Sequence, residues 1–301
     1  MTKVLIVGST GTVGSLVLEE VLRRGTDARV LVRDEQRAAH LPAHVERHVG
    51  DLGDPEAVRG AMKGVQAAFY IPPHEPDEVR LGTSFVRAGE EAGIRLVLAG
   101  THISDPQMRA AFVESMPAYR GKLEVSTAFA ASTANPVVIA LANYNQNDEI
   151  FKEDILNGVY PTPIKRSNRI DLRDMAELAA TALIDPAFPS GEYALIGPES
   201  FTGAEAAEIW AAELGRPVTY VDGDGEWQAI FGKRLAEQKL EDWISSFVLL
   251  KNAEFPTDPA QVQEVTRLLG HAPRDYRSYV RETARLWKSQ ERSAPPATSS
   301  I

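Results

Sequence analysis

One short segment near the start of the chain restricts the possible folds more than any other. It consists of seven residues: Gly8, Ser9, Thr10, Gly11, Thr12, Val13 and Gly14. An apolar, largely β-branched run at Val4–Val7 precedes it, and a helical pattern over Thr12–Arg24 begins inside it. A strand, a glycine-rich turn and a helix in this order suit phosphate binding, because free N–H groups at the helix start attract an anion. The segment predicts a dinucleotide-binding loop; the alternative is a purely structural turn.

Strand and helix patterns alternate through the first half of the chain. Strands are predicted at Val4–Val7, Ala28–Val32, Val45–Val49, Ala67–Ile71, Arg95–Ala99 and Pro136–Ala142. Helices are predicted between them at Thr12–Arg24, Pro55–Lys63 and Asp77–Ala92. Such alternation with short links favours a parallel sheet covered by helices on both faces. The expected fold class is α/β, with a Rossmann-type doubly wound parallel sheet.

The second half of the chain is mixed. Helices are predicted at Leu172–Leu183, Gly203–Leu214, Asp258–Leu269 and Tyr276–Lys288, with strands at Glu192–Ile196 and Val218–Asp222. Glu226–Leu250 is expected to form one long helix with an irregular apolar face. The strand near residues 192–196 is expected to complete the sheet of the first half.

The amino-acid composition excludes several classes of chemistry. The chain has no cysteine, which excludes disulfides, thiolate metal sites, iron–sulfur clusters and a cysteine nucleophile. A net charge of −10 argues against a nucleic acid partner. We expect no membrane partner, because no apolar run approaches the roughly 20 residues that a span needs, and a cytoplasmic location. His40, His44 and His48 are not expected to bind a metal, since Pro42 interrupts a helix there.

The glycine spacing and four later segments carry a family resemblance. The loop reads Gly-x-x-Gly-x-x-Gly, and with its Ser-Thr-Gly centre it resembles the short-chain dehydrogenase/reductase superfamily. The further segments are Val32-Arg33-Asp34, Gly50-Asp51-Leu52, Asn143-Tyr144-Asn145-Gln146-Asn147 and Ile170-Asp171-Leu172-Arg173-Asp174. Together they resemble the atypical NmrA-like branch, which includes quinone-reductase-like enzymes and NADPH-sensing regulators. The resemblance covers roughly residues 1–290.

The resemblance also suggests how the chain is organised. An NAD(P)-binding Rossmann domain is expected over residues 1–142. A smaller mixed α/β region that caps the substrate is expected over residues 143–290, interleaved with the first domain. The small, polar residues 291–301 are expected to form a flexible tail.

The end of the second strand bears on the choice of cofactor. Arg33 there would pair with a 2′-phosphate, whereas Asp34 would accept a hydrogen bond from a ribose 2′-hydroxyl. The choice therefore depends on which of the two residues ends the strand. The resemblance and the nearby Arg37 favour NADP(H), with NAD(H) as the alternative and two ordinary solvated arginines as a third interpretation.

Further cofactor contacts follow from the resemblance alone. Asp51 and Leu52 match the turn that contacts adenine, although Asp51 would equally serve to form a turn before the next helix. Ile71 and Pro72 match the point where the family's backbone passes beside the cofactor. A proline lacks an N–H group, so contacts there would use carbonyl groups or apolar surface.

The catalytic residues of the superfamily find only partial matches. The superfamily usually has a tyrosine and a lysine four residues apart, and here Tyr119 and Lys122 are three apart. Both would still share one helix face. The resemblance assigns Lys122 to the cofactor ribose and to catalysis, Tyr119 to proton transfer, and Thr101 to the superfamily's Ser/Thr position. The alternatives are a surface lysine and a packing tyrosine.

Candidate substrate contacts cluster after strand ends, where ligands of open parallel sheets bind. They are Pro73, His102, Asn143, Tyr144 and Asn147. Tyr144 is a second candidate for the proton donor, and His102 is able to supply an acid near neutral pH. Asparagines at a strand end also suit simple turns.

The leading hypothesis is an NADP(H)-dependent oxidoreductase that transfers hydride to a small carbonyl-, quinone- or imine-type substrate. The alternatives are an NADP(H)-sensing regulator without turnover, and a non-redox isomerase or lyase on the same scaffold. The irregular spacing of Tyr119 and Lys122 keeps both alternatives open. The expected partner is a small molecule, and the chain is expected to be a monomer or a homodimer.

Overall fold

The computed structural model describes residues 2–101, 103, 106–141 and 143–293. The chain divides into two compact units. The first unit comprises Met1–Ala142, Leu172–Ile196 and Pro259–Pro273, and the second comprises Asn143–Asp171, Gly197–Asp258 and Arg274–Ile301. In the described ranges, no helix has the length and apolar character that a membrane crossing requires.

The first unit is built on a sheet of seven strands. They are β1 (Lys3–Val7), β2 (Asp27–Val32), β3 (Glu46–Val49), β4 (Ala67–Tyr70), β5 (Arg95–Gly100), β6 (Val137–Leu141) and β10 (Gly191–Leu195). Their spatial order is β10-β6-β5-β4-β1-β2-β3, and every pair is parallel. Strand order reverses on either side of β1, which is the arrangement of a doubly wound sheet. The predicted Rossmann-type fold is therefore confirmed.

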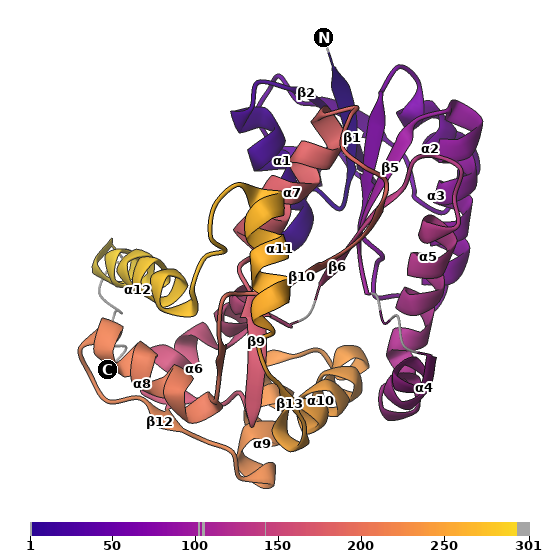
Figure 1. The fold of residues 1–301 in the computed structure, drawn as a ribbon. Helices are drawn as coiled ribbons and strands as arrows, with labels where there is room; N and C mark the ends of the chain where they lie inside the picture. The colour runs from indigo at the N-terminus through magenta and orange to yellow at the C-terminus, as the bar shows by residue number, and fades with distance from the viewer. Residues whose placement is uncertain (1, 102, 104–105, 142, 294–301) are drawn as a thin grey trace. The chain divides into compact units, whose positions relative to one another are not determined.

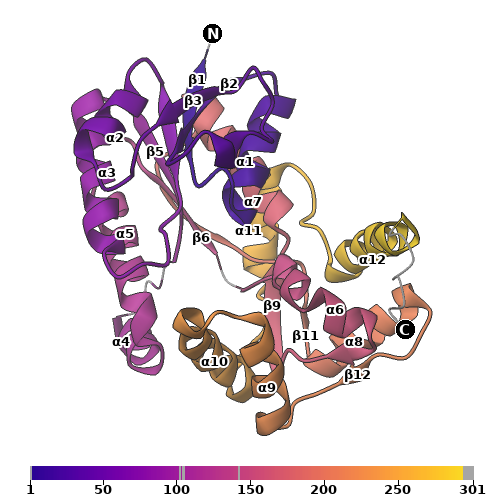
Figure 2. The same ribbon diagram turned by 180° about the vertical axis from the view of Figure 1, so that it is seen from behind.

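Helices cover both faces of this sheet (Figure 1). The helices of this unit are α1 (Thr12–Arg23), α2 (Pro55–Met62), α3 (Glu78–Ala92), α4 (Pro106–Ser115), α5 (Arg120–Ala130), α7 (Leu172–Ile184) and α11 (Pro259–Leu269), with short 3₁₀ turns η1 (Gln36–Ala38) and η2 (Pro117–Tyr119). α2, α3 and α5 pack side by side on one face, while α1 and α7 pack together on the other. Figure 2 shows the same two layers from behind.

Local sequence signals explain where these helices begin and end. Gly25 has a φ of +73° immediately after α1, which is the left-handed conformation of a terminating glycine. The side chain of Asp54 accepts a hydrogen bond from the N–H of Glu56 at 2.9 Å, and Pro55 occupies the first position of α2. The central strands β1 and β4 are largely apolar, and Leu5 and Ile6 are completely buried.

The second unit combines small sheets with helices. Its strands are β7 (Asn143–Tyr144), β8 (Val159–Tyr160), β9 (Arg166–Ile170), β11 (Ser200–Phe201), β12 (Thr219–Tyr220) and β13 (Glu254–Phe255). Its helices are the 3₁₀ helix η3 (Asn145–Phe151), α6 (Lys152–Leu156), α8 (Gly203–Leu214), α9 (Asp224–Arg234), α10 (Glu237–Asn252) and α12 (Tyr276–Ser293). An aromatic core that includes Trp210, Trp227 and Phe231 holds the unit together. The ring of Trp210 stacks on that of Trp287, with their centroids 4.8 Å apart.

One expectation about the C-terminal half needs correction. The expected single helix over Glu226–Leu250 is wrong, because Leu235 and Ala236 adopt extended conformations that separate α9 from α10. Arg234 at the end of α9 pairs with both Asp154 and Glu153 of α6, and Leu235 packs against the aromatic core. These contacts offset the helical hydrogen bonds lost at the break. α12 extends to Ser293, three residues into the expected tail, and residues 294–301 lie outside the described residues.

Candidate functional site

The glycine loop connects β1 to α1 at the point where the strand order reverses. Gly8 has a φ of +76°, and a Cβ built on it would lie 2.7 Å from Cγ2 of Ile71. A Cβ on Gly14 would lie 2.3 Å from the carbonyl oxygen of Gly8. Packing inside the protein therefore requires glycine at both positions. The close approach of α1 to the loop accounts for the third glycine.

Gly11 differs from the other two glycines because the fold itself leaves room for a side chain. A Cβ there would lie 3.5 Å from the carbonyl oxygen of Gly8, an ordinary contact distance. Gly11 is the N-cap of α1, and in the described residues no side chain caps this helix and its first turn holds no acid. The N-terminus of α1 is therefore open to an anion. The missing Cβ of Gly11 lets that anion approach the backbone.

The other loop residues divide between the surface and the core. Thr10 and Thr12 are exposed, whereas Val13 is buried against the sheet. The Ser9 side chain is buried, and its Oγ has no hydrogen-bond partner in the described part of the chain. A buried hydroxyl without a partner is costly, by about 1–3 kcal/mol. A phosphate oxygen at the loop would satisfy it, so this site fits a dinucleotide.

The segment after β2 presents two cations that pair with no residue in the described part of the chain. β2 ends at Val32, and Arg33 follows it directly with an exposed side chain. Oδ1 of Asp34 accepts the N–H of Gln36 at 2.8 Å, so this carboxylate stabilises a turn. Neither Arg33 nor Arg37 makes an ion pair or hydrogen bond with any described residue. These cations suit a 2′-phosphate better than a free hydroxyl.

The remaining predicted cofactor contacts follow the carboxyl ends of β3 and β4. Oδ1 of Asp51 accepts the N–H of Gly53 at 2.7 Å, so the residue does form a turn, and Leu52 packs against the core. Ile71 follows β4 and lies against the glycine loop, as its distance from the hypothetical Cβ of Gly8 shows. Pro72 and Pro73 come next and are half-buried.

Lys122 is paired with an acid that sequence reasoning missed. Its Nζ lies 2.9 Å from Oε2 of Glu78, the first residue of α3. The side chain of Glu78 is only 7% exposed, and that of Lys122 is 18% exposed. The two residues are 44 positions apart in the chain, so no local sequence pattern signals their contact.

The other two predicted catalytic residues have different surroundings. Tyr119 ends η2 and caps α5, and its ring packs edge-on against Phe112 with the centroids 5.5 Å apart. Thr101 follows β5, and its N–H donates to Oγ of the buried Ser126 at 3.1 Å. Tyr119 therefore lies in the turn before α5, whereas Lys122 lies in the first turn of that helix. His102 lies outside the described residues.

Tyr70, at the end of β4, was also missed by sequence reasoning. Its ring stacks within a core of Phe85 and Phe129, and its hydroxyl has no partner among the described residues. Burial raises the pKa of Tyr70 well above its usual value, and the carboxylate of Glu78 raises it further. This phenol therefore remains neutral at physiological pH.

The asparagine-rich segment of the second unit is held by a buried ion pair. Oδ1 of Asn143 accepts the N–H of Tyr144 at 2.9 Å and the Nδ2 amide of Asn147 at 2.5 Å. An Nη2–H group of Arg169 donates to the carbonyl oxygen of Tyr144 at 2.7 Å. Nη1 of Arg169 lies 2.9 Å from Oδ1 of Asp148, and both side chains are completely buried. Sequence reasoning missed this pair.

The ion pair stabilises the charge of its own arginine. Burial alone would lower the pKa of Arg169, but the Asp148 carboxylate, together with Tyr160 and Tyr276, raises it above the usual value. Asp148 also accepts hydrogen bonds from the indole of Trp210 and the hydroxyl of Tyr276. The network fixes the backbone of Tyr144 from within the unit.

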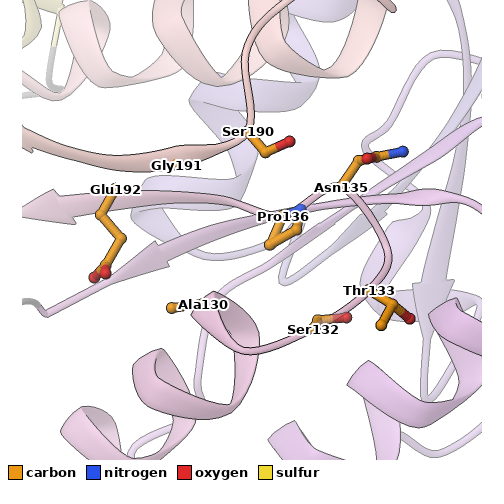
Figure 3. A pocket seen from close by; sticks show the side chains of 8 residues that line it. All are labelled: Ala130, Ser132, Thr133, Asn135, Pro136, Ser190, Gly191 and Glu192. Carbon is orange, nitrogen blue, oxygen red and sulfur yellow. The ribbon is translucent and has the colours of Figure 1, made fainter.

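A separate hollow of about 400 Å³ lies at the other edge of the first unit's sheet. Figure 3 shows it between Asn135, Pro136 and Gly191, where β6 and β10 begin. All strands of the sheet run parallel, so this is the amino edge, opposite the glycine loop. Ligands of open parallel sheets bind at the carboxyl edge. The glycine loop and its neighbours therefore remain the candidate site.

Comparisons with known proteins identify the family of the chain. The sequence model of the NmrA-like family matches residues 1–280. The chain is 29% identical to the NAD(P)H azoreductase of Xenophilus azovorans over 222 residues, which cover 72% of this chain and 76% of the azoreductase.

Two solved structures share the fold. The NADPH-dependent quinone oxidoreductase of Escherichia coli, solved with NADPH, has a TM-score of 0.77 and 19% identity, covering 93% of this chain and 99% of its own. The negative transcriptional regulator Nmra has a TM-score of 0.77 and 18% identity, covering 98% of this chain and 99% of its own. At such identities the likeness extends to the fold alone.

Proposed function

The chain belongs to the NmrA-like family, and from that premise we propose that it is an NADP(H)-dependent reductase. NADPH supplies a hydride when it is bound. The acceptor in this proposal is a small conjugated molecule of the carbonyl, quinone or imine class. The azoreductase relative, which is similar over most of both chains, supports a nicotinamide-dependent reduction.

The observation that carries the proposal is the open N-terminus of α1 together with Arg33, which follows the neighbouring strand β2 and has no partner among the described residues. The loop has one glycine that the fold itself does not need, Gly11, and one buried hydroxyl without a partner in the described residues, that of Ser9. Both features are explained by a bound pyrophosphate. Arg33 supports NADP(H) over NAD(H), because the competing carboxylate of Asp34 is already engaged in a turn.

Lys122, Tyr119 and Thr101 are the proposed catalytic residues. In this proposal the ammonium of Lys122 donates hydrogen bonds to the cofactor ribose. Its positive charge also favours proton release from a neighbouring hydroxyl group. Tyr119 or Thr101 in the first unit, or Tyr144 in the second, transfers the proton at the substrate oxygen or nitrogen. Asn143, Asn147 and Pro73 are the proposed substrate contacts.

A second candidate is an NADP(H)-sensing regulator without turnover. The departure of Tyr119 and Lys122 from the usual spacing supports it, as does the fold that the chain shares with Nmra. A sensor needs the same phosphate contacts as a reductase. The two functions therefore differ in turnover and not in cofactor affinity.

The test combines a binding measurement with a turnover screen. NADPH affinity is measured by the fluorescence of the reduced nicotinamide, and NADPH oxidation is followed by absorbance with quinones, aldehydes, ketones and imines. Binding together with turnover on one of these classes supports the reductase. Tight binding with no turnover on any class would favour the sensor, and absence of binding would refute both.

A further inference from the structure

A buried acid beside the proposed catalytic lysine calls for an explanation. The carboxylate of Glu78 is almost completely buried and lies 2.9 Å from the Lys122 ammonium. Burying a carboxylate is costly unless the charge has a partner with good geometry. An exposed ion pair would stabilise the fold as well without this cost. The location of the pair therefore points to a role beyond stability.

Two features of the chain accommodate this acid. Glu78 is the first residue of α3, where the helix dipole favours a negative charge. Gly121 lies beside it in α5, and a Cβ on Gly121 would lie 2.4 Å from Oε1 of Glu78 and 3.0 Å from its Cγ. Gly121 is the second residue of α5, and glycine is a weaker helix former than alanine. The sequence thus retains a weak helix former that makes room for Glu78.

The pair also lies at the edge of the sheet where a cofactor would bind. α3 and α5 both connect parallel strands, so each begins at the carboxyl edge of the sheet. The glycine loop is at the same edge. The two helices pack side by side along their length (Figures 1 and 2). Glu78 and Lys122 lie in the first turns of these helices, and their charged groups are in contact.

We propose that Glu78 is a positioning residue that holds the Lys122 ammonium in place for the ribose of NADP(H). This inference rests on the proposed function. The ammonium has three N–H groups, and Glu78 accepts one of them. The other two have no partner among the described residues. Glu78 restricts the rotation of a long flexible side chain, so that these two N–H groups are directed before the cofactor arrives.

The test is a double-mutant cycle on cofactor binding, which needs no substrate. The variants are Glu78→Gln, Lys122→Met and the combination of both. Two ligands are compared: NADPH, and adenosine 2′,5′-bisphosphate, which has the adenine half of NADPH but no nicotinamide ribose. Glu78→Gln is expected to weaken NADPH binding about tenfold, the equivalent of one charge-assisted hydrogen bond. Binding of the bisphosphate is expected to stay within about twofold.

The combined variant decides whether Glu78 acts through the lysine. In the Lys122→Met background, Glu78→Gln is expected to cause no further loss of NADPH affinity. Additive losses would overturn the inference, and so would an equal loss for both ligands, which would indicate general damage to the fold. Asp77→Asn is the control, because it removes the same charge one residue away from an exposed pair with Arg80. Asp77→Asn should leave both affinities unchanged.

A second variant guards against a loss of folding in Glu78→Gln. Gly121→Ala keeps both charged groups, and alanine favours the helix, but its Cβ would displace Glu78. Gly121→Ala is expected to weaken NADPH binding as much as Glu78→Gln does. Its stability, measured as the urea concentration at which half of the protein is unfolded, should be at or near that of the unaltered chain. Unchanged NADPH affinity would refute the inference. Failure of the unaltered chain to bind NADPH would instead refute the proposed function, so the two failures are distinguishable.

Discussion

The carbonyl oxygen of Gly8 lies 2.3 Å from the point that a Cβ on Gly14 would occupy. Gly14→Ala is therefore expected to destabilise the fold by about 1–3 kcal/mol, because the backbone of the loop must move. Urea unfolding measures this change. A Gly14→Ala variant with unchanged stability would contradict the close packing of α1 on the loop.

Gly11→Ala is expected to separate binding from stability. Its Cβ meets only an ordinary contact within the protein, so the loss of stability should stay below about 1 kcal/mol. NADPH affinity should nevertheless fall about 10- to 100-fold, because the methyl group obstructs hydrogen bonds to a charged phosphate. Parallel titrations and urea unfolding of both glycine variants check this. Undiminished affinity would mean that the loop does not carry the cofactor.

Replacement of Lys122 is expected to remove turnover. Lys122→Ala should lower kcat at least about 100-fold on any substrate that the unaltered protein reduces, since a group that assists proton transfer contributes on this scale. The matched control is Lys165→Ala, which removes a half-exposed lysine paired with Glu254 in the second unit. Steady-state assays of both variants decide the matter. Retained activity in Lys122→Ala would transfer the role to another residue.

The buried ion pair between Arg169 and Asp148 is expected to stabilise the second unit. Arg169→Met leaves Asp148 charged and buried without its cation, so the free energy of unfolding should fall by about 3–5 kcal/mol. Arg267→Met, which breaks an exposed pair with Glu264, should change it by less than about 1 kcal/mol. Urea unfolding of the two variants provides the comparison. Equal effects would show that the network around Asp148 does not support the unit.

His271 gives the first unit a mild pH dependence. A hydrogen bond that the imidazole donates to the Glu177 carboxylate, followed by one to the carbonyl of Ala272, raises the pKa of His271 above 6.5 in the folded protein. A raised pKa means that the stabilisation is fully present below the pKa of the unfolded chain and is lost as pH rises through the folded value. Since the imidazole is about two-fifths exposed, the effect on Tm should be about 1–3 °C. Tm is measured below and above neutral pH for the unaltered chain and for His271→Gln. The variant should lose the part of the Tm change that the titration of His271 causes. An identical change of Tm with pH in both proteins would contradict the assignment.

The sequence predicted the first unit well because its signals are local. The apolar strands, Gly25 after α1 and the cap at Asp54 all act over a few residues. The second unit was harder to predict. Strands of two residues, such as β7 and β13, form only because β9 pairs with them. The break at Leu235 depends on contacts with α6 and the core, and no glycine or proline occupies residues 233–236.

In the candidate site, too, some residues could be predicted from local signals in the sequence and others could not. The glycine loop was predictable from the order of strand, turn and helix, and Arg33 from its place after a strand. Glu78, Tyr70 and the Asp148–Arg169 pair were not, because each joins segments that are distant in the chain. Charged residues at such positions look like ordinary surface residues until the fold buries them.

The central claim is that this chain binds NADP(H) through the glycine loop and recognises its 2′-phosphate with Arg33. The most direct measurement compares the dissociation constants of NADPH and NADH for the unaltered chain, for Arg33→Ala, and for Arg87→Ala, a control that removes an exposed arginine from α3. We predict that Arg33→Ala weakens NADPH binding about 10- to 100-fold, the equivalent of a charge-assisted hydrogen-bonded pair, and leaves NADH binding almost unchanged. Arg87→Ala should affect neither cofactor. An equal loss for NADPH and NADH in Arg33→Ala, or no binding of either cofactor to the unaltered chain, would contradict the account.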